Sequence, residues 1–163
     1  TLKFKVVSNF ISDKLETTFM FTKDSTISKS FSRESGYTSC NTKISIKPPI
    51  GGYLDSTELI PYPELNLPPR VGDSIYSEHK IPNGISLKSD LIKGYQKVVG
   101  KTHYKNKFID EDVWVIESYN LIKPNYLAKY YFSSNYGFVY FNYKFEDIDI
   151  KIELINYENH LNK

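Results

Sequence analysis

Apolar and polar residues alternate most regularly near the C-terminus. The apolar set there is Ile148, Ile150, Ile152 and Leu154, and the charged residues between them are Asp149, Lys151 and Glu153. A period of two places one set on a core and the other in water, so the run predicts a half-buried β-strand. Similar runs upstream extend this into a predicted meander of antiparallel neighbours. Its strands are expected at residues 113–119, 126–133, 138–145 and 148–155.

Turn-forming residues separate the two most aromatic of these runs. The string from Ser133 to Gly137 contains serine, asparagine and a glycine that is free to adopt positive φ, which predicts a β-hairpin. Upstream, residues 91–108 predict one long strand, or two short strands broken at Gly100. Glycines inside a strand often mark bulges, so Gly94 and Gly100 predict bulges in this one.

The N-terminal third shows weaker alternation. Its apolar groups are Leu2, Phe4 and Val6, then Phe19 and Phe21, then Ile44 and Ile46. Serine, threonine and lysine fill the positions between them, and the pattern predicts three further strands.

Residues 47–73 interrupt the β pattern. The breakers there are Pro48, Pro49, Pro61, Pro63, Pro68 and Pro69, with Gly51, Gly52 and Gly72. Because proline cannot donate to a strand ladder, the chain is expected to run irregularly. One short helical turn is predicted from Asp55, with Glu58 as its capping partner.

Composition agrees with a β fold and with one domain. The chain has 163 residues, 14 tyrosines, 10 phenylalanines and one alanine, Ala128, whereas alanine is the strongest helix former. This length suits one core. We therefore predict a single all-β domain, residues 1–163, with a curled antiparallel sheet that forms a partial barrel or a sandwich.

Charge and phosphate-binding motifs disfavour two classes of partner. The net charge is only +2, and Arg33 and Arg70 are the only arginines, so few residues could make bidentate contacts with phosphates or bases. The Gly51-Gly52 pair lacks the residues of a phosphate-binding loop. We expect no nucleic-acid partner and no cofactor.

The chain offers no recognisable catalytic or metal-binding set. Its histidines are His79, His103 and His160, which we interpret as solvated residues on sheet faces or ends. Cys40 is the single cysteine, interpreted as structural, and no Cys/His spacing resembles a zinc site. We therefore predict no catalytic residue, no metal site and no enzymatic activity.

Two acidic clusters motivate one enzymatic hypothesis, that the chain is a carboxylate-based hydrolase. They are Asp110, Glu111 and Asp112, and Glu146, Asp147 and Asp149. Neither has the spacing of a calcium loop. Charges at hairpin tips and strand edges also improve solubility and protect edges, and this is the interpretation we favour.

Tyrosine enrichment raises the question of a binding surface, because tyrosine is common in interfaces. One group of six tyrosines lies in or between the predicted C-terminal strands, where aromatic pairs stabilise a sheet without a ligand. These are Tyr126, Tyr130, Tyr131, Tyr136, Tyr140 and Tyr143. The irregular segment supplies better binding candidates, since long loops often carry function. They are Tyr53, Tyr62, Glu64 and Arg70.

The ends and apolar runs of the chain bear on localisation. No stretch approaches the roughly 20 apolar residues of a membrane helix. The sequence begins at Thr1, and its only methionine is Met20. A truncated chain would look the same, but we expect a mature form from which an export signal has been removed.

Five short motifs follow one another from Pro68 onward. They are PPRVGD at residues 68–73, GYQKVVG at 94–100, VWVIE at 113–117, YYFS at 130–133 and YGFV at 136–139. In this order they resemble the motifs of uncharacterised exported β-domains and lipoproteins of Gram-negative bacteria. The resemblance implies a curled antiparallel sheet or partial barrel, and a periplasmic or outer-membrane location. It carries over no catalytic residue.

Two non-enzymatic hypotheses follow. The first is a cell-envelope domain that binds a protein or an apolar ligand on a concave aromatic face. Its membrane attachment would come only through an N-terminal tether. The second is an immunity or inhibitor protein that neutralises a toxin through residues 47–73.

Overall fold

The chain is all-β, as the sequence predicts, and it folds into two antiparallel sheets. The computed structural model describes residues 2–8, 13–23, 26–47, 52–82, 89–146 and 148–154. One short 3-10 helix, η1 (Gly52–Leu59), accompanies the strands. Nowhere in these ranges is there a helix with the length and apolar character needed to cross a membrane.

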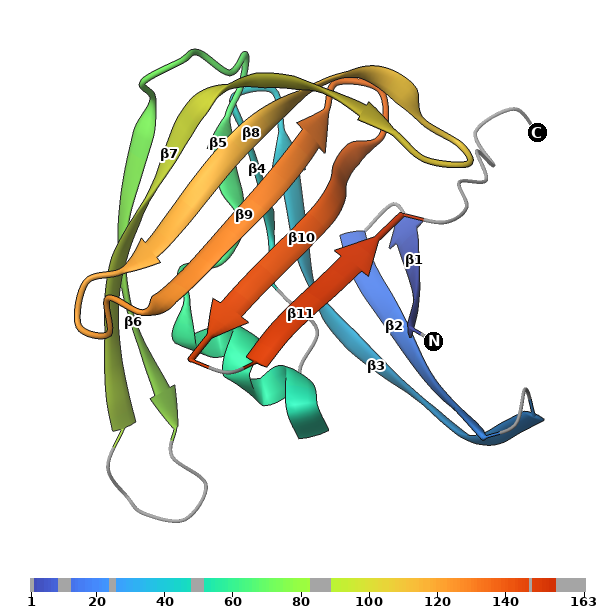
Figure 1. Ribbon diagram of the computed structural model, residues 1–163. Coiled ribbons are helices and arrows are strands. Elements are labelled where there is room, and N and C mark those ends of the chain that lie inside the picture. The colour runs from blue at the N-terminus through green and yellow to red at the C-terminus, as the bar shows by residue number, and fades with distance from the viewer. Residues whose placement is uncertain are drawn as a thin grey trace.

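The larger sheet is a six-stranded meander (Figure 1). Its strands, in spatial as well as chain order, are β6 (Ser74–Pro82), β7 (Ser89–Lys105), β8 (Asp110–Asn120), β9 (Tyr126–Ser133), β10 (Gly137–Phe145) and β11 (Ile148–Glu153). The hairpin expected between β9 and β10 is present, and Gly137 has a φ of 77° at its turn. The predicted C-terminal meander is confirmed.

The second sheet has five strands. They are β1 (Leu2–Ser8), β2 (Asp13–Lys23), β3 (Thr26–Cys40), β4 (Lys43–Ile46) and β5 (Glu64–Asn66). The sequence predicts β1, β2 and β4 and misses β3 and β5. β3 is rich in serine, so pairing with β2 and β4 rather than apolar alternation defines it. β5 has only three residues.

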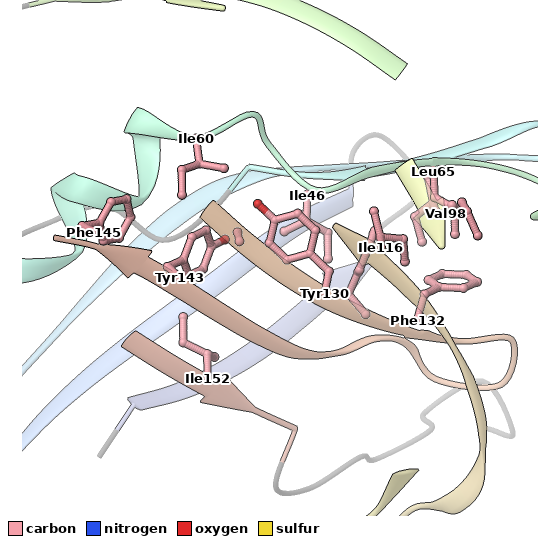
Figure 2. Close-up of a cluster of buried hydrophobic side chains, with 13 residues drawn as sticks. Ile46, Ile60, Leu65, Val98, Ile116, Tyr130, Phe132, Tyr143, Phe145 and Ile152 are labelled. Atoms are coloured by element: carbon pink, nitrogen blue, oxygen red, sulfur yellow. The ribbon is translucent and has the colours of Figure 1, made fainter. Parts of the chain in front are cut away.

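The main core lies between the two sheets, so the arrangement is a sandwich (Figure 2). The smaller sheet contributes Ile44, Ile46 and Leu65, and the larger one contributes residues such as Tyr130 and Tyr143, which are 0% and 1% exposed. The tyrosines of β9 and β10 therefore stabilise the fold itself. A second, smaller cluster forms on the opposite face of the larger sheet, around Ile109, Val113 and Val139, with Tyr104, Tyr131, Tyr136, Tyr140 and Leu154 packed against it.

The described part of residues 47–73, which is 47 and 52–73, is irregular outside η1 and β5, as expected, but it also supplies core. Ile60 is fully buried, and Leu54 and Leu65 are 5% and 2% exposed. The helical turn expected at Asp55 belongs to η1, which begins earlier, at Gly52. The segment after η1 covers the inner face of β7 to β9, so it acts as part of the sandwich rather than as a surface loop.

Side chains of the larger sheet satisfy the buried backbone of this segment. The carbonyls of Glu58, Leu59, Pro61 and Tyr62 accept hydrogen bonds from His79 Nε2 (3.2 Å), Asn120 Nδ2 (2.6 Å), Tyr130 Oη (3.0 Å) and Gln96 Nε2 (2.5 Å). Glu64 N donates to Gln96 Oε1 at 3.1 Å. An irregular backbone cannot satisfy itself, so these bonds replace the ladder that a strand would have had.

The two glycines of β7 have different roles. Gly100 lies at a register shift against β8, so the bulge predicted there is confirmed. Gly94 keeps its register with both neighbouring strands, so the bulge predicted there is wrong. The position requires glycine because a Cβ would lie 2.2 Å from Tyr119 O and 2.5 Å from Pro61 Cγ.

Replacing Gln96 by leucine is expected to lower the free energy of unfolding by about 2 kcal/mol or more, because it leaves Tyr62 O and Glu64 N without their partner. Urea denaturation measures the change. Asn142→Leu is the matched control, since Asn142 Oδ1 has no hydrogen-bond partner. Equal losses in the two variants would contradict the role assigned to Gln96.

Gly94→Ala should destabilise the fold by about 1–3 kcal/mol, the usual cost of overpacking, because the new methyl group meets a backbone carbonyl. Thermal unfolding compared with Lys80→Ala, at an exposed position of β6, isolates the steric effect. A Gly94→Ala variant as stable as the wild type would show that Pro61 and β8 can move apart without cost.

Candidate binding surface

The four binding residues predicted from the sequence do not form one site. Tyr53 lies in η1, and its side chain is outside the described residues. Tyr62 and Glu64 bond to side chains of the fold itself, and Arg70 lies in the exposed connection between β5 and β6. Of the three whose side chains are described, only Arg70 therefore reaches open solvent in a way that suits recognition.

Tyr62 is part of a polar cluster between η1 and β6. Its ring packs on the ring of His79 at a centroid distance of 4.6 Å, and its hydroxyl donates to Glu58 Oε1 at 3.5 Å. Lys47 Nζ lies 3.7 Å from the same carboxylate oxygen. Burial is the main cause, and the nearby Glu58 carboxylate the second, of a rise in the pKa of Tyr62 to about 12. These contacts join η1 to β6 and leave Tyr62 little freedom to meet a partner.

His79 therefore departs from the prediction that the histidines are solvated. The Glu58 carbonyl can only accept, so Nε2 of His79 carries the proton in this bond. Glu64 is similarly engaged, because its carboxylate pairs with Lys43 Nζ at 2.7 Å. The Glu64–Lys43 pair joins β5 to β4 within the smaller sheet, and His79 joins β6 to η1.

Arg70 begins a tightly closed turn. Asp73 N donates to Arg70 O at 3.1 Å, and Arg70 N donates to Asp73 Oδ2 at 3.0 Å. Gly72 adopts a φ of 94°, as required at the third position of a type II turn. The turn is also fixed to β7, since Gly72 N donates to Val98 O and Val98 N donates to Asp73 O, both at 2.9 Å.

This rigid turn exposes apolar side chains to water. Val71 is 67% exposed at the turn, and Val99, next to the strand residue that holds the turn, is 40% exposed. Two cationic residues, Arg70 and Lys97, are exposed on the same two segments. We call these four residues the turn surface. In Figure 1 the turn lies in the green connection between β5 and β6, at the top of the view.

The sequence identifies only one residue of the turn surface, Arg70. A usable signal exists for Val71, because an apolar residue between arginine and glycine at a turn has no strand face on which to be buried. Val99 could not have been found in this way. In sequence it resembles any apolar strand residue, and only the structure shows that it lies on the exposed face with Lys97, opposite the buried Gln96 and Val98.

The inner aromatic face offers little room for a small ligand. Its tyrosines and phenylalanines are buried between the sheets. A hollow between β5 and β7, lined by Leu65, Gln96 and Val98 among others, has a volume of about 10 Å³, enough for roughly one water molecule. Ligand pockets are commonly about 300–1,000 Å³. The turn surface is therefore the stronger candidate for recognition.

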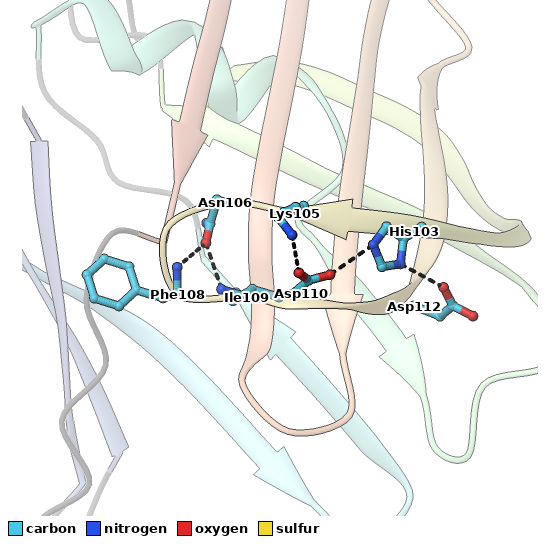
Figure 3. Close-up of polar contacts among 7 residues, drawn as sticks. All are labelled: His103, Lys105, Asn106, Phe108, Ile109, Asp110 and Asp112. Atoms are coloured by element: carbon cyan, nitrogen blue, oxygen red, sulfur yellow. Dashed lines mark hydrogen bonds and ion pairs between the residues drawn. The ribbon is translucent and has the colours of Figure 1, made fainter.

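A second polar group lies where β7 turns into β8 (Figure 3). His103 Nε2 is 3.0 Å from Asp110 Oδ1, and His103 Nδ1 is 3.3 Å from Asp112 Oδ1. Lys105 hydrogen-bonds to Asp110 and holds the pKa of that carboxyl below its usual value. His103 is 61% exposed, but both ring nitrogens face carboxylates, so neither is aimed at a nucleophile.

The remaining chemistry-bearing residues are used in turns or fall outside the described residues. Glu111 accepts hydrogen bonds from Ser133 and Asn135, which ties this corner to the β9–β10 turn. His160 and Asp147 are outside the described residues. Within the described ranges, no group of three or more histidine, cysteine, aspartate or glutamate residues could hold a metal ion.

An outward-facing row of tyrosines crosses the larger sheet but is largely self-contained. Tyr76 on β6 pairs with Tyr95 on β7, which pairs with Tyr119 on β8. Tyr95 and Tyr119 stack at 5.0 Å, and Tyr119 donates to Glu117 at 2.5 Å. The hydrogen bond to Glu117 is the main cause, and burial the second, of a rise in the pKa of Tyr119 to about 12. Tyr76, 60% exposed, is the row's open end.

Comparisons with family models, curated proteins and solved structures give no match to this chain. The residues and their geometry therefore carry the functional argument.

Stability should fall at alkaline pH. Unfolded tyrosines ionise near pH 10.0, whereas Tyr62 and Tyr119 in the folded chain hold their protons to about pH 12. Between these values only the unfolded chain releases the protons, so rising pH favours unfolding. Urea midpoints measured across this range should decline, and Tyr62→Phe should decline less steeply. An unchanged slope in that variant would contradict the contribution of Tyr62.

Proposed function

We propose that the chain is a non-enzymatic binding domain that engages a protein partner through the turn surface. The observation that carries the proposal is the exposure of Val71, on a turn closed by hydrogen bonds between Arg70 and Asp73, and of Val99 on the adjacent strand β7. Exposed apolar side chains in a rigid setting suit association, because little conformational entropy is lost on binding.

A protein partner is favoured over an apolar ligand by shape. The turn surface is an open exterior feature, and the hollow beneath it is of water size. A cell-envelope location remains part of the proposal and depends on the sequence resemblance alone. Fractionation of cells that express the full-length protein tests it, and recovery in the cytosol would remove it.

An immunity or inhibitor protein is the second candidate. It is supported by the position of the turn surface, which includes Arg70, at the end of the segment where the sequence suggests a toxin-binding interface. The two candidates differ in what the partner does. A toxin whose activity is suppressed by the chain would favour the second candidate, and a partner of unaltered activity would favour the first.

Val71→Ser should weaken binding to the protein partner by about tenfold or more, as expected when a well-seated apolar contact is lost. Partners are isolated from the source organism on the immobilised wild-type chain, and their dissociation constants are then measured for each variant. Leu121→Ser is the matched control, because Leu121 is 51% exposed in the β8–β9 connection.

If binding is lost in Leu121→Ser and retained in Val71→Ser, the binding site lies in the β8–β9 connection and not on the turn surface. Recovery of no protein above background by the wild-type chain would count against a protein-binding domain altogether.

A further inference from the structure

We infer that the partner of the turn surface is an acidic protein segment that carries an apolar side chain. This inference rests on the proposed function and adds the chemical class of the partner. It follows from which groups of the turn surface are already paired within the fold and which are left available.

The apolar contact has a defined position. Val71 precedes Gly72 and Val99 follows Val98, and the hydrogen bond from Gly72 N to Val98 O joins the two segments. The two exposed valines therefore flank one backbone contact, and the pairing of β7 with β8 fixes that contact in turn. Because hydrogen bonds hold this contact, a partner's apolar side chain that is placed there would require little rearrangement of the chain.

The charges around this contact are cationic and available. Arg70 and Lys97 are exposed, and neither forms an ion pair with another described residue. Lys101 is excluded from this surface, because it follows the bulge and its Nζ lies 4.5 Å from the ring centroid of Trp114 on the inner side of the sheet. A guanidinium and an ammonium group beside an apolar contact complement carboxylates that flank an apolar side chain.

The neighbouring carboxylates are already used. Asp73 accepts the hydrogen bond from Arg70 N, which closes the turn. Glu117 lies opposite Lys97 in the pairing of β7 with β8, but it is bound by Lys129 Nζ at 3.2 Å and by the Tyr119 hydroxyl. The positive charge of the turn surface is thus only partly balanced within the fold, and a partner's carboxylates would balance it.

The opposite end of the sheet does not share this chemistry. The exposed apolar residues there are Leu121, Ile122 and Ile148. Lys123 and Lys144 are close to them in sequence, but so are Glu146 and Asp149. With both signs of charge present, that end shows no preference for an acidic partner, and it can serve as the internal control.

A library of random peptides displayed on phage tests the inference without knowledge of the natural partner. The wild-type chain is used for selection, and peptides that also bind Val71→Ser are discarded. The remaining peptides should carry aspartate or glutamate on both sides of an apolar residue. One of them is then synthesised and titrated against purified variants.

Reversing two charges, Arg70→Glu with Lys97→Glu, should weaken binding of that peptide by about tenfold or more, and added salt should weaken wild-type binding as charges are screened. Lys144→Glu is the matched control, because it reverses one exposed lysine at the other end of the sheet. Its affinity for the peptide should match that of the wild type.

Three results would overturn the inference. Neutral or basic peptides that depend on Val71 would refute the acidic partner and leave the proposed protein-binding function standing. If selection yields no peptide that depends on Val71, both the acidic partner and the proposed protein-binding function are refuted. Binding of the wild type to phosphatidylglycerol vesicles, lost in the double charge reversal, together with no selected peptide, would assign the cations to a lipid surface instead.

Discussion

The fold depends on one constraint, the burial of an irregular backbone between two sheets. The chain from Glu58 to Glu64 crosses the inner face of the larger sheet without a strand ladder of its own for most of its length. Its carbonyls would cost about 1–3 kcal/mol each if left unsatisfied. Side chains of β6, β7, β8 and β9 bond to them, so four strands are tied to one segment.

This constraint explains several residues that would otherwise be unexpected in a core. Gln96 and Asn120 are each 2% exposed, and Tyr130 is fully buried with its hydroxyl. Polar groups at such depth are stable only when they are paired, and each of these finds a partner on the segment. Gly94 belongs to the same arrangement, since the absence of a side chain lets Pro61 approach β7 closely.

The sequence predicts β7 to β11 of the larger sheet well because the necessary information is local, whereas β6 is not among the predicted runs. Alternation in β11, aromatic runs in β9 and β10, and turn residues between them are all readable within a few neighbours. The five-stranded sheet is less readable, since β3 is polar and β5 very short, and both are defined by pairing with distant residues. The candidate site is the least readable part. Tyr62 resembles a loop residue in sequence yet contacts His79, and Val99 resembles a strand residue yet faces water.

The bulge at Gly100 changes which side chains of β7 point to each face of the sheet. Before it, Ile92, Gln96 and Val98 point into the sandwich. After it, Lys101 stands opposite Trp114 on that inner side, and Tyr104 instead joins the cluster on the outer face, against Tyr131 and Tyr140. One extra residue thus lets a single strand serve two hydrophobic clusters on opposite faces of its sheet. Removing it would exchange the environments of every side chain that follows in the strand.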